Sequence, residues 1–260
     1  MSRQEELKCL EKVKCGISEE YYLNKQIGSH SFGQRMECNY YCKESGRIAE
    51  ALINAKENPN ENDFPDFIVV GGFIEHFTVS AAKENRHGSE YRKKESEINR
   101  KWQSEFENEK EEFFESVYIP NQININTKRE DLDIFTYKNF KHSFCKNWDN
   151  HINCLKNYSG DKTLGIFLVE YKGALLKEMN NGRFIGFYQL NRDKETLQYI
   201  FDNRDFLGYV IFTDGQYFEI IAIKDIPELI KSIGKDVVFE GGIEKKRRID
   251  IFVIFRCRSN

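Results

Sequence analysis

The run Leu164-Gly-Ile-Phe-Leu-Val-Glu-Tyr171 constrains the fold more than any other stretch of the 260-residue sequence. It is as long as a β-strand and nearly every position is apolar, so neither face of the strand suits contact with water. A strand buried on both faces is typical of the centre of an α/β sheet that has helices above and below it. The run therefore predicts an α/β protein built around this strand.

Amphipathic patterns predict the helices that would cover such a sheet. They fall over residues 46–55, 83–117 and 138–158, and the second of these segments is rich in charged residues. In the third segment, apolar side chains recur every three or four positions, which places them on one face of a helix. This expected buried stripe comprises Phe140, Phe144, Trp148, Ile152 and Leu155.

The remaining chain predicts a mixed β-sheet flanked by helices within a single domain. We expect a hairpin over 209–223 closed by the turn pair Asp214-Gly215, then a short helix over 226–233 and a strand over 248–255. Residues 1–57 are expected to be mostly helical. The expected organisation is a helical N-terminal extension (1–45), an α/β core (46–79 and 138–255) and a charged helical insertion (80–120).

The net charge, the lengths of the apolar runs and the cysteine content limit the classes of protein to which the chain can belong. The net charge is −3, so any basic stripe for nucleic-acid phosphates must be local. No apolar run approaches the roughly 20 residues that a membrane-spanning helix needs, and the first residues are too polar for a signal peptide. Seven cysteines in a chain of this size are typical of reduced thiols in the cytoplasm. We therefore expect a cytoplasmic protein without membrane contact.

Four of the cysteines lie early in the chain, at Cys9, Cys15, Cys38 and Cys42, and His30 could replace one of them as a zinc ligand. Zinc is usually held by two closely spaced pairs of ligands. Only the spacing of the second pair resembles that of a zinc knuckle. Ordinary buried thiols are therefore the simpler interpretation, and a zinc site is the alternative.

Two acids flank a glycine pair in the apolar segment Pro65–Thr78. With Gly71-Gly72 at the centre of a tight turn, Asp66 and Glu75 would be diagonal neighbours on one face, about 7–8 Å apart at Cα. Two carboxylates at this reach can bind one divalent cation, whereas without a cation they would repel each other among apolar neighbours. Strand alternation places His76 on the opposite face, as a packed core histidine.

This segment resembles the metal-binding core of the PD-(D/E)XK nuclease superfamily. That core has a helix that often carries a Glu, a strand that begins with Pro-Asp and a strand with an (Asp/Glu)-x-Lys element. The sequence offers Glu50, Pro65-Asp66 and Glu75-His76-Phe77 in this order. The resemblance implies a restriction-endonuclease-like core in which Asp66 and Glu75 hold Mg²⁺ or Mn²⁺, with Glu50 assisting. The metal would polarise a phosphodiester and activate water.

The catalytic lysine of the superfamily has no counterpart in this element, because Phe77 stands at its position. Lys83 keeps the strand parity and would supply the missing catalytic amine if the strand continues. A second placement takes Glu170-Tyr171-Lys172 as the (D/E)XK element, at the end of the buried strand. It restores the lysine but widely separates the two acids in the sequence.

Two functions are consistent with these features. The paired acids favour a divalent-metal-dependent nuclease that hydrolyses phosphodiester bonds in DNA, of restriction or phage-defence type. Phe77 favours a non-catalytic nuclease-like protein that acts as a protein-interaction module. The charged helix expected over 83–117 could also support a homodimer.

Overall fold

The structure, a computed structural model of the chain, describes residues 3–23, 37–41, 45–60, 63–82, 100, 131–132, 135–173, 175–215, 217–234 and 237–243. Its main helices are α1 (Arg3–Leu23), α2 (Ser45–Ile53), α4 (Tyr137–Asn157), α5 (Lys194–Asp202) and α6 (Ile226–Ser232), with short 3-10 helices η1 (Leu190–Arg192) and η2 (Ile223–Asp225). Its strands are β1 (Glu37–Tyr41), β2 (Lys56–Glu57), β3 (Phe67–Val69), β4 (Gly72–Val79), β5 (Asp131–Leu132), β6 (Leu164–Tyr171), β7 (Leu175–Asn180), β8 (Arg183–Phe187), β9 (Tyr209–Thr213), β10 (Tyr217–Ala222) and β11 (Val237–Ile243).

The larger of two sheets has seven strands in the order β1-β10-β9-β6-β4-β3-β2. Its central strands β4, β6 and β9 are parallel neighbours, while β2, β3 and β4 form an antiparallel meander on one side. On the other side, β10 is antiparallel to β9 and β1 is parallel to β10. The prediction of an α/β protein with a mixed sheet is therefore confirmed, and β6 is its middle strand.

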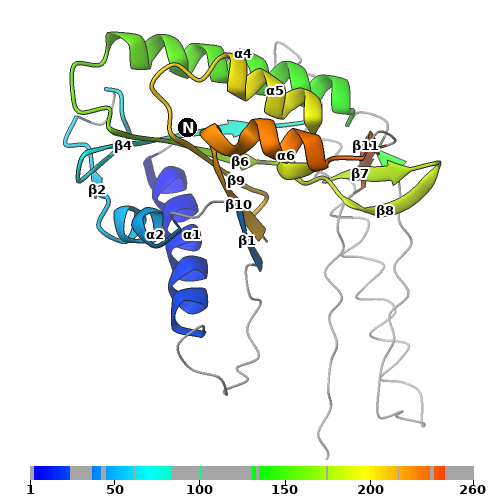
Figure 1. Ribbon diagram of the computed structural model, residues 1–260, viewed down its shortest axis with the longest axis horizontal. Coiled ribbons are helices and arrows are strands. Elements are labelled where there is room, and N and C mark those ends of the chain that lie inside the picture. Colours follow the sequence, from blue (N-terminus) through cyan, green and yellow to red (C-terminus); the bar gives the residue numbers. More distant parts are fainter. Residues whose placement is uncertain are drawn as a thin grey trace, which may run out of the picture.

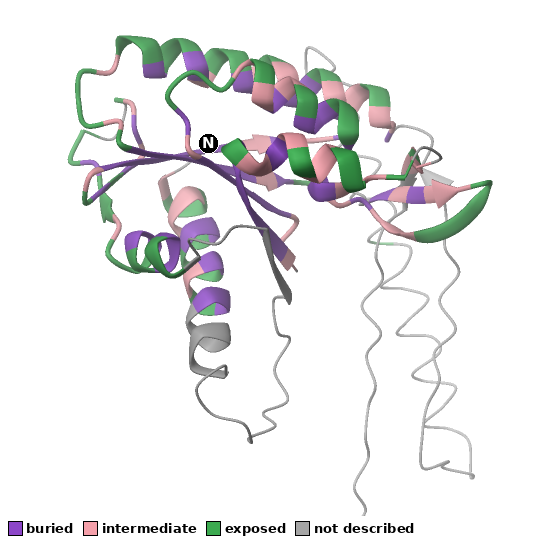
Figure 2. Ribbon diagram, in the orientation of Figure 1, coloured by how far each residue is buried: buried purple, intermediate pink, exposed green. Residues whose placement is uncertain are grey.

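Helices cover both faces of this sheet (Figure 1). On one face, α1 and α2 bury Leu10 and Ile48 against the sheet. On the opposite face, α4, α5 and α6 enclose a larger core that contains Phe144 and Trp148. Figure 2 shows the buried residues concentrated in the strands and on the helix faces that point towards them. The two cores explain why the central strands need apolar side chains on both faces.

Two predictions about this core are confirmed. Strand β6 spans the predicted run, with Leu168 in the core beneath α1 and Phe167 in the core beneath α4. The predicted stripe of α4 is buried in full. The predicted short helix with Pro227 in its first turn is also present, as α6.

The described part of residues 1–57 is mostly helical, as predicted, apart from β1 and β2. Two details differ from the prediction, and one feature was not predicted. Residues 37–41 form strand β1 instead of helix, because the edge of β10 offers them a parallel partner. The β9–β10 hairpin pairs Thr213 with Phe218, so Asp214-Gly215 is not a two-residue turn; hydrogen bonds from Gly215 N–H and Tyr217 N–H to side-chain oxygens stabilise a longer loop. A second, four-stranded sheet in the order β5-β11-β7-β8 was not predicted.

Other predictions concern residues that the structure does not describe. They are most of the charged insertion (80–120) and the strand expected over 248–255. Both stay predictions.

The β3–β4 hairpin has a different register from the predicted one. Val69 pairs with Gly72, so the turn is centred on Val70-Gly71, and Gly71 has a φ of 77° that favours glycine. Gly72 serves a different purpose, because a Cβ atom there would lie 1.9 Å from the main-chain oxygen of Leu164 in β6. Continuing this register places Asp66 opposite Glu75 instead of diagonal to it.

Glu219 of β10 is a buried acid that links the sheet to η1. Its side chain is fully buried, and its carboxylate accepts hydrogen bonds from the main-chain N–H groups of Leu190 and Asn191 at 2.9 and 2.8 Å. Burial raises the pKa of Glu219 from 4.5 to about 7 despite these hydrogen bonds. The carboxylate therefore holds a proton in the folded protein at pH values where the unfolded chain has lost it.

This raised pKa predicts a loss of stability with rising pH. Between pH 4.5 and about 7, the free energy of unfolding of the wild type should fall relative to that of Glu219→Gln, which has no proton to lose there. The relative fall should reach about 3.5 kcal/mol at most, at about 1.4 kcal/mol per pKa unit. Urea unfolding at a series of pH values measures it. Glu228→Gln, on the exposed side of α6, is the control; parallel curves for wild type and Glu219→Gln would contradict the prediction.

Candidate functional site

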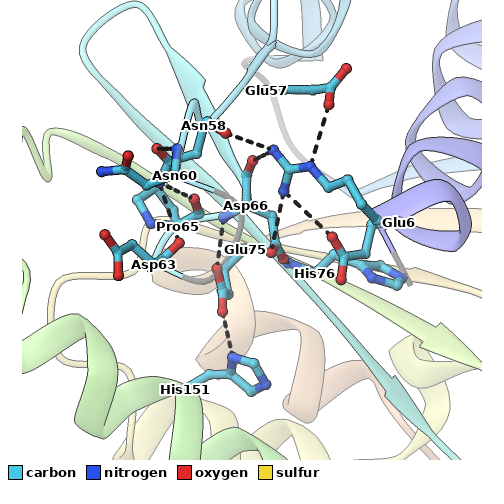
Figure 3. Close-up of polar contacts among 11 residues, drawn as sticks. Glu6, Glu57, Asn58, Asn60, Asp63, Pro65, Asp66, Glu75, His76 and His151 are labelled. Carbon is cyan, nitrogen blue, oxygen red and sulfur yellow. Dashed lines mark hydrogen bonds and ion pairs between the residues drawn. The ribbon is translucent and has the colours of Figure 1, made fainter. Parts of the chain in front are cut away.

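Glu75 lies on the face of β4 that α4 covers. Its Oε2 accepts a hydrogen bond from the main-chain N–H of Asp66 at 3.0 Å, and its Oε1 lies 2.6 Å from Nδ1 of His151 on α4. Figure 3 shows Glu75 extended towards His151. Glu75 is buried and both of its carboxylate oxygens have partners. The side chain therefore links the β3–β4 hairpin to α4.

Phe77 belongs to the same buried layer. Its ring stacks on the His151 ring, with centroids 4.7 Å apart, and meets Trp148 and Phe167 edge to face. A lysine at this position would therefore extend into an aromatic core and not towards a solvated phosphate. At the position of the missing lysine, residue 77 therefore has a packing role.

Asp66 lies in a bend just before β3, where strand alternation does not fix the direction of a side chain. Its Oδ2 accepts a hydrogen bond from the main-chain N–H of His76 at 2.7 Å, and its Oδ1 lies 3.7 Å from Nη1 of Arg3 on α1. Burial and the charge of Glu75 raise the pKa of Asp66 to about 6. The carboxylate is thus short of positive charge, even with Arg3 nearby.

His76 lies on the opposite face of β4 from Glu75, as strand alternation predicted, and its side chain is fully buried beneath α1. Its Nε2 is 3.3 Å from Oε2 of Glu170, the next strand's acid, but the two groups do not have hydrogen-bond geometry. Both ring nitrogens and this oxygen are therefore buried without a hydrogen-bond partner. Buried polar atoms in this state are costly, which makes them candidates for binding a ligand.

Glu170 and Lys172 stand at the end of β6, beside His76. Lys172 Nζ lies 3.4 Å from Oε2 of Glu170 and 3.9 Å from the Glu5 carboxylate of α1. Burial acts to raise the pKa of Glu170, but the contacts with His76 and Lys172 outweigh it and lower that pKa. Glu170 is thus an ionised acid in a largely apolar strand.

Helix α1 completes the polar surroundings of His76. It contributes the buried thiol of Cys9, the carboxylate of Glu6 and the guanidinium of Arg3, which also donates to the main-chain oxygens of Asn58 and Asp66 at 3.2 and 2.7 Å. In Figure 3, Glu6 and His76 lie to the right of Asp66, whereas His151 lies below it. The residues of this α1-face cluster are Arg3, Glu6, Cys9, Asp66, His76, Glu170 and Lys172.

The α1-face cluster contains two sets of metal-ligand atoms that lie within 4.8 Å of one another. One set comprises Glu6, Asp66 and His76, and the other comprises Cys9, His76 and Glu170. The ring nitrogens of His76, which make no hydrogen bond, and the carboxylate of Glu170, whose Oε2 has ion-pair contacts with His76 and Lys172, suit a cation. Among the residues that the structure describes, the α1 face is therefore the best candidate for a metal centre.

The structure does not bring the predicted ligand set of Glu50, Asp66 and Glu75 together as one group. Glu50 is exposed on α2, Glu75 is bound to His151, and neither belongs to a set of metal-ligand atoms. The hairpin register was expected to bring the acids together, but the two carboxylates turn to different partners. Lys83, the predicted catalytic lysine, lies outside the described residues.

Some signals for this site were present in the sequence. Glu170 is the one acid in the apolar run of β6, and Glu170-Tyr171-Lys172 was the second placement of the (D/E)XK element. Strand alternation predicts the face of His76 correctly, and the residue is buried as a core histidine should be; that its ring nitrogens make no hydrogen bond could not be predicted. Glu6 was not predicted, because nothing local shows that the first helix packs over β4 and β6.

Comparison with known proteins adds no further constraint. No protein-family model, no curated protein and no solved structure matches the chain. Among the described residues, no helix combines the length and apolar character needed to cross a membrane. The function has to be inferred from the geometry of the α1-face cluster.

Restoring the missing lysine tests the packing role of Phe77. We expect Phe77→Lys to lower the free energy of unfolding by about 3 kcal/mol or more, because it removes buried aromatic contacts and buries a charge. Chemical denaturation measures this change. Val70→Lys is the control, since Val70 is 89 % exposed at the tip of the same hairpin. Equal stability of the two variants would contradict the assignment.

Proposed function

We propose that the protein is a divalent-metal-dependent nuclease that hydrolyses phosphodiester bonds in DNA through the α1-face cluster. The observation that carries this proposal is the buried imidazole of His76, whose ring nitrogens make no hydrogen bond. Its ring nitrogens lie within 4.8 Å of a carboxylate oxygen of Asp66 and of Glu170, and Glu170 belongs to the Glu170-Tyr171-Lys172 element. The lysine that the Glu75 element lacks is thus present beside a different acid.

The chain order of the elements supports the same proposal. Helix α2 is followed by the antiparallel meander β2-β3-β4, then by α4 and by β6, which pairs in parallel with β4. This order agrees with the core expected from the resemblance to PD-(D/E)XK nucleases. Fold alone does not determine function, so the weight rests on the cluster.

The donor set of Glu6, Asp66 and His76 fits a divalent cation. Carboxylate oxygens suit Mg²⁺ and Mn²⁺, and an imidazole nitrogen makes Mn²⁺ the better match. A bound cation would polarise the phosphodiester and lower the pKa of an attacking water. Lys172 would neutralise charge on a bound phosphate, and Asp66 and Glu6 would hold the cation in place. Cytoplasmic DNA, of invading or cellular origin, is the expected substrate.

The alternative is a non-catalytic nuclease-like protein that binds another protein. The guanidinium of Arg3 favours it, because it lies 3.7 Å from Asp66 and thereby supplies a positive charge without a metal. Titration of Mn²⁺ into the wild type and into Asp66→Asn separates the two functions, since only the nuclease predicts binding that depends on Asp66.

Cleavage assays with matched variants test the nuclease. Wild-type protein should cleave DNA with Mn²⁺ or Mg²⁺, and Asp66→Asn, Glu170→Gln and Lys172→Met should each lower the rate by about 100-fold or more. Lys194→Met on the exposed start of α5 is the control and should retain the wild-type rate. Thermal unfolding checks that each variant is folded. Cleavage that survives in both Asp66→Asn and Glu170→Gln, or is absent from the wild type, rejects the proposal.

A further inference from the structure

The second set of ligand atoms in the α1-face cluster has a donor chemistry of its own. It combines the thiol of Cys9 on α1, the imidazole of His76 on β4 and the carboxylate of Glu170 on β6. Sulfur, nitrogen and oxygen donors together are typical of Zn²⁺, whereas Mg²⁺ takes oxygen ligands. We propose that Cys9, His76 and Glu170 bind a zinc ion that joins the first helix to the two central strands.

The spacing of the donors agrees with this assignment. Two ligands of a tetrahedral zinc ion lie about 3.4 Å apart, as follows from zinc–ligand distances of about 2.0–2.2 Å. His76 Nε2 and Glu170 Oε2 are separated by 3.3 Å, yet they do not form a hydrogen bond. A zinc ion between them would satisfy both atoms, and the buried Cys9 sulfur lies within 4.8 Å of a ring nitrogen of His76 and a carboxylate oxygen of Glu170.

The charges of the three ligands balance that of a zinc ion, and Lys172 adds a positive charge 3.4 Å from Glu170 Oε2. One Zn²⁺ offsets the thiolate of Cys9 and the carboxylate of Glu170, and the neutral imidazole of His76 adds no charge. Binding releases the Cys9 proton to solvent, since zinc takes the deprotonated thiol. Three protein ligands leave the fourth position open, which is the arrangement of catalytic zinc sites.

The remaining acids of the α1-face cluster would support the zinc site. A metal-bound histidine usually donates its other ring N–H to a carboxylate, and the carboxylates of Glu6 and Asp66 lie within 4.8 Å of a His76 ring nitrogen. With zinc bound to His76, Glu6 and Asp66 would remain as the protein ligands of a second cation, Mg²⁺ or Mn²⁺, in place of the full set of Glu6, Asp66 and His76. The zinc site therefore goes beyond the proposed nuclease and does not require that cleavage occurs.

Cobalt substitution gives a direct test. The full chain, freed of metal with a chelator, is titrated with Co²⁺, whose absorption spectrum reports both tetrahedral geometry and thiolate ligation. We expect one equivalent to bind with a thiolate-to-cobalt band, and Zn²⁺ to displace it. The absence of this band in the wild type would overturn the proposal.

Variants assign the ligands. Cys9→Ser and Glu170→Gln should lower the affinity for Zn²⁺ by at least about 100-fold, and Cys9→Ser should also remove the thiolate band. Cys15→Ser is the matched control, because Cys15 is exposed on the same helix and should bind as the wild type does. Unchanged binding by Cys9→Ser would show that other thiols hold the metal and would reject the site.

Two further measurements separate zinc binding from effects on folding and from nuclease activity. Zn²⁺ should raise the melting temperature of the wild type and of Cys15→Ser but not that of Cys9→Ser, each compared with the same variant without metal. Asp66→Asn should lose cleavage and keep the cobalt spectrum. A failed nuclease assay therefore leaves the zinc result standing, and loss of the cobalt spectrum in Cys9→Ser does not depend on cleavage.

Discussion

The parallel pairing of β4 with β6 is the contact on which the rest of the structure depends. It brings the hairpin against a strand that lies far from it in the sequence, and it is so close at Gly72 that no side chain fits between the two backbones. The pairing is buried on both faces, which fixes the sides on which the two helical layers pack. It also brings His76 and Glu170 together, because Leu168 is the register partner of His76 and Glu170 lies two residues further along the same face.

The two faces of β4 differ in whether their buried polar side chains have hydrogen-bond partners. On the α4 face, Glu75 has two good partners, so its carboxylate is fully accommodated by hydrogen bonds. On the α1 face, His76 and Glu170 are buried with atoms that no hydrogen bond satisfies. A protein interior tolerates such groups poorly unless something else compensates them. The contrast explains why the acid that sequence patterns favoured has an anchoring role, while the histidine next to it marks the candidate metal centre.

Local sequence patterns could predict the α/β class, the buried strand, the stripe on α4 and the face on which His76 lies, because each follows from a short periodicity. They could not predict the ligand set. The direction of Asp66 depends on a bend outside the strand, and the partnership of His76 with Glu170 depends on pairing between distant segments. The contribution of Cys9 and Glu6 depends on how α1 docks. The glycine pair led to the wrong prediction of the β3–β4 register, because Gly72 is required by its close contact with β6 and not by the turn.

Arg3 fastens the first turn of α1 to the loop that leads into β3, since its guanidinium donates to main-chain oxygens of Asn58 and Asp66. The order of that turn and the position of the Asp66 backbone are consequently linked by the same side chain. Unwinding of the turn would withdraw one positive charge from the acid and release two carbonyl groups of the loop in a single event. The first turn of α1 thus holds the loop that contains Asp66 in place. Unwinding of this turn would change both the rigidity of the loop and the electrostatic potential at the Asp66 carboxylate.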